Sequence, residues 1–132
     1  MIYENGKYRI DFEDLEEKAS DSRTTMLILC NPHNPIGHEW DRTDLERVAE
    51  ICNRNDVFVI SDEAHSDIVY RGHKHTAFVT LNEETAQNSA SINSPGKAFN
   101  VNGLYASYVI VPNKKIRMGF QRSFFTEASG EM

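Results

Sequence analysis

Three polar segments of the sequence carry side chains that could do chemistry, and apolar runs lead directly into two of them. Residues 31–37 (Asn-Pro-His-Asn-Pro-Ile-Gly) supply carboxamides, residues 61–67 supply carboxylates and the imidazole of His65, and residues 94–103 supply the amine of Lys97. Groups of these types transfer protons, bind polar ligands and attack electrophilic carbon. They can act as one site only if the fold brings the three segments together.

The acidic segment also suggests a nucleic-acid-dependent ATPase, because an apolar strand followed by Asp-Glu-Ala-His holds the magnesium ion in one class of these enzymes. Such an ATPase also needs a phosphate loop of the form GxxxxGK[ST]. The nearest candidate, residues 91–98, has Ser91 in place of the first glycine and Ala98 in place of the hydroxyl residue, and it follows the acidic segment instead of preceding it. A DEAH-type ATPase therefore stays a remote alternative.

A metal site built from His65, His73 and His75 is a further alternative. His73 and His75 would share one face of a strand, but no cysteine lies nearby and the surrounding residues are typical of a polar loop. Zinc requires a closed tetrahedral set of ligands, or three ligands and an open position. We therefore expect no metal.

The elements that must position the three segments predict an α/β fold class with three layers and a mainly parallel sheet. Strands are predicted at residues 26–30, 57–61, 89–93 and 105–111, and a short strand or a hairpin around Asn5 and Gly6 is predicted within 1–10. Helices are predicted at 11–20, from a Thr43–Glu46 capping box onward, and in the tail to Met132. The continuous apolar run at 26–30 predicts a strand buried on both faces. A strand-helix-strand order with short connections favours parallel pairing. Ligands of such sheets bind beyond the carboxyl ends of the strands, where the three polar segments fall.

Taken together, the three segments resemble motifs of fold-type-I pyridoxal-phosphate (PLP) enzymes. Residues 31–37 resemble their Asn-Pro-x-Asn-Pro-x-Gly loop, residues 61–65 resemble the strand end that binds the pyridinium, and residues 94–104 resemble the segment of the Schiff-base lysine. The flanking residues 5–15 and 106–112 resemble the cystathionine β-lyase-type branch of the class I and II aminotransferases. The resemblance implies an aminotransferase or a C–S lyase that acts on small amino acids.

The same resemblance implies roles for five side chains. Lys97 would form the Schiff base with the cofactor and, once displaced by the substrate amine, would move a proton at the substrate α-carbon. Asp62 would face the pyridine nitrogen and keep it protonated. Asn34 would donate a hydrogen bond to the phenolic oxygen, His65 would pack near the ring, and Ser94 would contact the phosphate.

Two positions and the length depart from the family pattern. Tyr105 stands eight residues after Lys97, where many aminotransferases have an arginine that grips the phosphate, and Gly96 replaces a frequent serine. Such enzymes are also much longer than these 132 residues. We therefore predict that residues 1–132 form part of the PLP-binding large domain, without its N-terminal part and the C-terminal small domain, and that the isolated chain lacks enzymatic turnover.

Composition narrows the choice of partners. The formal net charge of −6 argues against a non-specific nucleic-acid surface. The sequence has no apolar run of roughly 18 residues, so no membrane partner is expected. Its two cysteines form no framework and predict reduced thiols in the cytoplasm. We expect a small amino-acid substrate and a homo-oligomer or association with the absent segments. A non-catalytic fragment or split-gene piece that pairs with another chain is the alternative, and the sequence leaves lyase and aminotransferase activity equally open.

Overall fold

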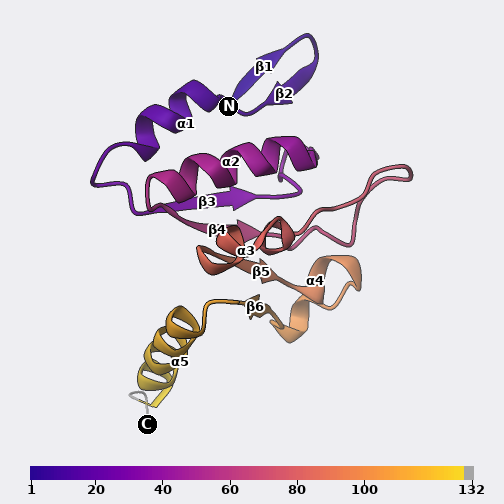
Figure 1. Ribbon diagram of the computed structural model, residues 1–132. Coiled ribbons are helices and arrows are strands. Elements are labelled where there is room, and N and C mark those ends of the chain that lie inside the picture. The colour runs from indigo at the N-terminus through magenta and orange to yellow at the C-terminus, as the bar shows by residue number, and fades with distance from the viewer. Residues whose placement is uncertain (130–132) are drawn as a thin grey trace.

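The computed structural model describes residues 1–129, and its centre is a four-stranded sheet (Figure 1). The strands lie in the order β3 (Met26–Cys30), β4 (Phe58–Asp62), β5 (Ser89–Asn93) and β6 (Tyr108–Ile110). The pairs β3–β4 and β4–β5 are parallel, whereas β6 runs antiparallel to β5. The predicted α/β class with a mainly parallel sheet is confirmed, although β6 is shorter than the predicted 105–111.

The register of the sheet brings the ends of three strands to one edge. Asp62 of β4 pairs with Cys30 of β3 on one side and with Ile92 of β5 on the other. Helix α2 (Arg42–Arg54) connects β3 to β4, and helix α3 (Glu83–Gln87) lies between β4 and β5. The chain therefore leaves every parallel strand at the same edge, which Figure 1 shows at the right of the sheet.

Aspartate side chains cap the N-termini of the first two helices. Asp11 caps α1 (Phe12–Ala19) by accepting a hydrogen bond from the Asp14 amide. Asp41 caps α2 by accepting a 2.9 Å hydrogen bond from the Asp44 amide, so the predicted capping box from Thr43 to Glu46 is wrong. Aspartate is at least as good an N-cap as threonine, and Asp41 lies two residues earlier in extended backbone.

The hydrophobic core lies between α2 and one face of the sheet. Leu45, Val48 and Cys52 of α2 are buried against Val59 of β4 and the Phe78 ring. Phe78 belongs to a 3₁₀ helix, η1 (Phe78–Thr80), that also packs on α3. This packing fixes the face of the sheet that carries odd-numbered residues of β4.

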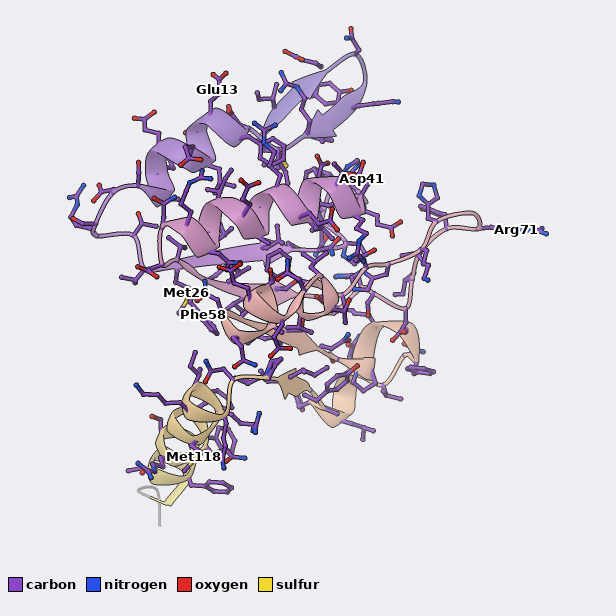
Figure 2. The ribbon with its side chains drawn as sticks, in the orientation of Figure 1. Glu13, Met26, Asp41, Phe58, Arg71 and Met118 are labelled. Atoms are coloured by element: carbon purple, nitrogen blue, oxygen red, sulfur yellow. The ribbon has the colours of Figure 1, made fainter. Side chains whose placement is uncertain are left out.

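The opposite face of the sheet is open to solvent. Met26 is 51% exposed and Ile28 is 71% exposed, so the prediction that this strand is buried on both faces is wrong. Met26 pairs with Phe58 where β3 and β4 begin, and both side chains are labelled in Figure 2. Successive strand residues point to opposite faces, and residues 1–129 place no helical layer over the face of Met26 and Ile28.

The remaining elements are small or peripheral. Asn5 and Gly6 adopt positive φ angles of 51° and 77° in the hairpin of β1 (Ile2–Glu4) and β2 (Lys7–Arg9), as expected for this turn pair. The tail forms α5 (Lys114–Ser129), and the last three residues of the predicted tail helix lie outside the described residues. Within the described part of the chain, no helix has the length and apolar character needed to cross a membrane.

Candidate functional site at the carboxyl edge of the sheet

Backbone hydrogen bonds hold the three polar segments side by side just beyond the strands. The Asn31 amide donates to the Asp62 carbonyl at 2.9 Å, and the Glu63 amide donates to the Ile92 carbonyl at 2.8 Å. These bonds continue the parallel ladder by one residue past β3 and β4. The segments that carry Asn34, Asp62 and Lys97 therefore all leave the sheet at one edge.

The loop after β3 is closed on itself and presents Asn34 outward. His33 and His38 form an isolated antiparallel bridge, and both rings pack edge-on against the buried Trp40. Trp40 in turn donates from Nε1 to the Cys30 carbonyl at 3.1 Å. The Asn34 side chain is exposed, and within residues 1–129 its carboxamide has no hydrogen-bond partner.

Asp62 is half-buried where β4 ends. Its Oδ1 accepts a 3.1 Å hydrogen bond from the Ala64 amide, which fixes the side-chain rotation in a tight turn. Oδ2 has no partner within the described residues. Because Asp62 pairs with Cys30 and Ile92, its carboxylate lies on the open face of the sheet.

His65 lines a cavity of about 390 Å³ between the loop after β3 and the segment after β4. Asn34 lies on the wall of the same cavity, so the structure brings these two predicted site residues together. His73 lines it as well and is 3.4 Å from Glu39. Arg71, in the long loop that follows β4, points away from the sheet (Figure 2).

The three histidines considered for a metal have separate contacts. His75 lies 3.3 Å from Glu63, His73 is paired with Glu39, and His65 faces the cavity. In residues 1–129, no group of three or more His, Cys, Asp or Glu side chains is placed to hold a metal ion.

Lys97 lies on a four-residue helix, α4 (Pro95–Ala98), that Ser94 holds in place. The Ser94 hydroxyl donates to the Ala106 carbonyl at 2.8 Å, and its oxygen accepts from the Gly96 amide at 3.2 Å. Ser94 thus caps the turn and ties it to the chain that enters β6. The Lys97 side chain is exposed, and its amine has no ion-pair partner among the described residues.

The two positions that depart from the family pattern adjoin this turn. A Cβ atom at Gly96 would lie 2.5 Å from Oδ1 of Asn102, so the Asn102 side chain occupies the space that a serine there would need. Tyr105 adopts a left-handed conformation with φ of 49° and is exposed.

Glu63 is the residue of this edge that sequence reasoning missed. It is 3% exposed and accepts hydrogen bonds from the Phe78 amide at 2.9 Å and the Ser91 hydroxyl at 3.0 Å. Burial by itself would raise the pKa of Glu63, but the contact with His75 and the hydrogen bond from the Phe78 amide favour the charged form, so the net pKa is lowered. A signal was available, because Glu63 continues the odd-numbered buried face of β4.

The edge thus offers an exposed amine, a carboxylate with one free oxygen and a free carboxamide. Within residues 1–129, no hydrogen bond or ion pair joins the side chains of Asn34, Asp62 and Lys97 to one another. Such a set could bind a ligand with a carbonyl group, a cationic ring nitrogen and a hydrogen-bond acceptor.

Comparison with known proteins decides the family. The family model described as aminotransferase class I and II matches residues 1–123. The chain belongs to this family. Among the aminotransferase class I and II relatives, cystathionine beta-lyase PatB of Bacillus subtilis (strain 168) is 47% identical over 123 residues, covering 93% of this chain and 32% of PatB. Kynurenine–oxoglutarate transaminase 3 of Mus musculus is 35% identical over 132 residues, covering 98% of this chain and 29% of the transaminase.

The fold of this class I and II aminotransferase chain also matches solved structures. Cystalysin from Treponema denticola, whose crystal structure contains pyridoxal 5′-phosphate, superposes with a TM-score of 0.90 at 34% identity, covering 92% of this chain and 31% of cystalysin. The chain spans about a third of the length of the curated relatives it matches.

Proposed function

We propose that this chain is the cofactor-binding part of a PLP-dependent enzyme of amino-acid metabolism, either an aminotransferase or a cystathionine β-lyase-type C–S lyase. The observation that carries the proposal is the arrangement at the sheet edge. Backbone bonds of 2.9 and 2.8 Å align the segments of Asn34, Asp62 and Lys97, while their side chains keep polar atoms free for a ligand. Cystalysin, a structural relative at 34% identity, contains this cofactor.

The donor set fits the cofactor group by group. The exposed Lys97 amine can bond covalently to an aldehyde carbon. The free Oδ2 of Asp62 can bind a protonated ring nitrogen, and its charge favours that protonation. The Asn34 carboxamide can donate to a phenolic oxygen, and His65 lies on the wall of the same cavity. When bound, PLP supplies the electron sink for the substrate α-carbon.

Ser94 fits the phosphate less directly. Its hydroxyl already donates a hydrogen bond to the Ala106 carbonyl, and its oxygen already accepts one from the Gly96 amide. Contact with a phosphate would require the hydroxyl to rotate away from Ala106. We infer that Ser94 contributes mainly by holding the turn of Lys97 and can add a phosphate contact by exchanging that bond.

The substrate class follows from the two kinds of relative. Both PatB, named as a lyase, and the mouse transaminase, named for kynurenine and oxoglutarate, match nearly all of this chain. The residues at the edge serve proton transfer at an α-carbon in either reaction. The substrate is therefore a small amino acid, whether the enzyme is a lyase or an aminotransferase. A location in the cytoplasm is part of the same proposal.

Association with other polypeptide is proposed from the open sheet face. Met26 and Ile28 expose apolar surface on β3, the strand at one end of the four-stranded sheet. Exposed apolar surface of this kind marks contact with a partner. The partner is a second copy or another segment of the enzyme; a non-catalytic chain that pairs through this face stays the alternative function.

A titration with PLP tests the proposal. The wild-type chain should develop a visible absorbance band that saturates with PLP, and Lys97→Ala should lack it. Lys115→Ala is the matched control, because Lys115 is also an exposed lysine and lies on α5, remote from the edge. A band of equal height in Lys97→Ala and the wild type would contradict the proposal.

A further inference from the structure

The buried carboxylate of Glu63 connects segments that leave the sheet separately. Its Oε1 accepts from the Ser91 hydroxyl of β5 at 3.0 Å and from the Phe78 amide at 2.9 Å. Its Oε2 lies 3.3 Å from Nε2 of His75. One side chain therefore joins the end of β4, the body of β5 and the point where the long 64–77 segment returns to the sheet.

Two buried amides extend these ties to the neighbouring strand ends. Asn31, fully buried after β3, donates from Nδ2 to the Thr76 carbonyl at 3.2 Å. Asn93, at the end of β5, donates to the Ser66 hydroxyl at 2.9 Å. The 64–77 segment is thus fixed to the ends of β3, β4 and β5 by side chains on the covered side of the sheet.

Each tied strand end leads to a different member of the proposed cofactor site. The chain continues from Asn31 to Asn34, from Asp62 directly to Glu63, and from Ser91 through Ser94 to Lys97. The ties lie on the face opposite the Asp62 carboxylate, because Asp62 and Glu63 are consecutive at a strand end. They can therefore fix the relative positions of the site residues without touching the ligand.

We propose that Glu63, held by Ser91, His75 and the Phe78 amide, is the positioning residue that fixes the segments of Asn34, Asp62 and Lys97 relative to one another. The proposal rests on the proposed function, since it assigns Glu63 a role toward the same cofactor. Among the described residues, His75 is the one ionisable side chain in contact with Glu63 from β4, β5, η1 and the 64–77 segment. Small displacements of positioned groups carry large costs in binding and reactivity, which is why such a tie matters.

Strand β5 offers a matched pair of variants. Ser91→Ala removes the hydroxyl bonded to Glu63, whereas Ser89→Ala removes a hydroxyl bonded to the Thr85 carbonyl at 2.6 Å. Both serines are buried and point to the same face, and Ser89 lies farther from the edge. Glu63→Gln adds a variant of nearly the same shape without the charge.

The test measures PLP affinity and the pH midpoint of the visible band, at a temperature where circular dichroism shows every variant folded. Ser91→Ala and Glu63→Gln should weaken PLP binding by about threefold or more and shift the midpoint. Ser89→Ala should change neither, even where its thermal stability falls as far as that of Ser91→Ala. Equal changes in the two serine variants, or no change in Ser91→Ala and Glu63→Gln, would overturn the proposal.

Hydrogen exchange of the cofactor-free chain separates this inference from the proposed function. A wild-type chain without a Lys97 adduct would refute the proposed function, and exchange would then decide the positioning role alone. Glu63→Gln should speed exchange at the amides of Asn31, Glu63 and Phe78 together, and Ser89→Ala should leave them protected. Faster exchange at Phe78 only would show that Glu63 does not couple the strand ends.

Discussion

Replacing Glu63 tests how much the buried carboxylate stabilises the fold. Glu63→Leu removes the acceptor of the Phe78 amide and of the Ser91 hydroxyl and leaves His75, itself nearly buried, without its partner. A buried donor left unpaired costs about 1–3 kcal/mol, and breaking a buried pair by removing one partner costs about 3–5 kcal/mol. These losses overlap, so we expect Glu63→Leu to lower the free energy of unfolding by about 3–5 kcal/mol.

Glu63→Gln removes the charge of the Glu63 side chain and keeps its shape. The glutamine oxygen can still accept from Phe78 and Ser91, while the charge-assisted contact with His75 is lost. We expect a loss of about 1–2 kcal/mol at neutral pH.

The lowered pKa of Glu63 determines how the stability difference between wild type and Glu63→Gln changes with pH. The folded pKa of Glu63 lies below its ordinary value of about 4.3, so its contribution is fully present above that pH and is lost as the pH falls through the folded pKa. The difference between wild type and Glu63→Gln should therefore shrink as the pH falls below about 5 and the Glu63 carboxylate is protonated.

Urea denaturation followed by circular dichroism at several pH values measures both quantities. Ser89→Ala, a buried hydroxyl remote from the carboxylate, is the control whose deficit should not depend on pH. A Glu63→Leu protein as stable as wild type, or a Glu63→Gln deficit that grows as the pH falls below about 5, would refute the assignment of an ionised, hydrogen-bonded Glu63.

Three further predictions concern local packing, capping and reactivity. Gly96→Ser should displace the exposed Asn102 side chain, whose Oδ1 would lie 2.5 Å from the new Cβ, so Tm should fall only slightly and Gly96→Ser with Asn102→Ala should match wild type; a large loss of Tm that Asn102→Ala does not restore would contradict the contact. Asp41→Ala should cost about 1 kcal/mol in urea denaturation, whereas Thr43→Ala should cost little, and the reverse order would restore Thr43 as the cap. Burial raises the pKa of Cys52 to about 11, so iodoacetamide at pH 8 should modify it only after unfolding, as peptide mass mapping will show.

Much of the fold could be predicted because its signals are local. The boundaries of β3 and β5 coincide with the predicted 26–30 and 89–93. At β3 an uninterrupted apolar run ends at the polar Asn31. The hairpin was predictable from Asn5 and Gly6, which tolerate positive φ. The order of strands and helices then implied that the three polar segments would share one edge.

The rest depends on contacts between distant residues. Ile28 is 71% exposed, which could not be predicted from the apolar run of β3, because exposure depends on which layers cover the sheet. Helix α4 is too short to show periodicity, so the cap that Ser94 provides was not apparent. The ties of Glu63 to Phe78 and Ser91 span 15 and 28 positions, and only the folded chain brings them together.

The most direct test of the proposed function is to trap the cofactor and locate it. The chain is incubated with PLP, reduced with borohydride, digested and mapped by mass spectrometry. We predict that the modified peptide contains Lys97, that Lys97→Ala abolishes this modification, and that Lys115→Ala leaves it unchanged. Modification spread equally over the other exposed lysines would show that Lys97 has no special environment and would contradict the proposed cofactor site.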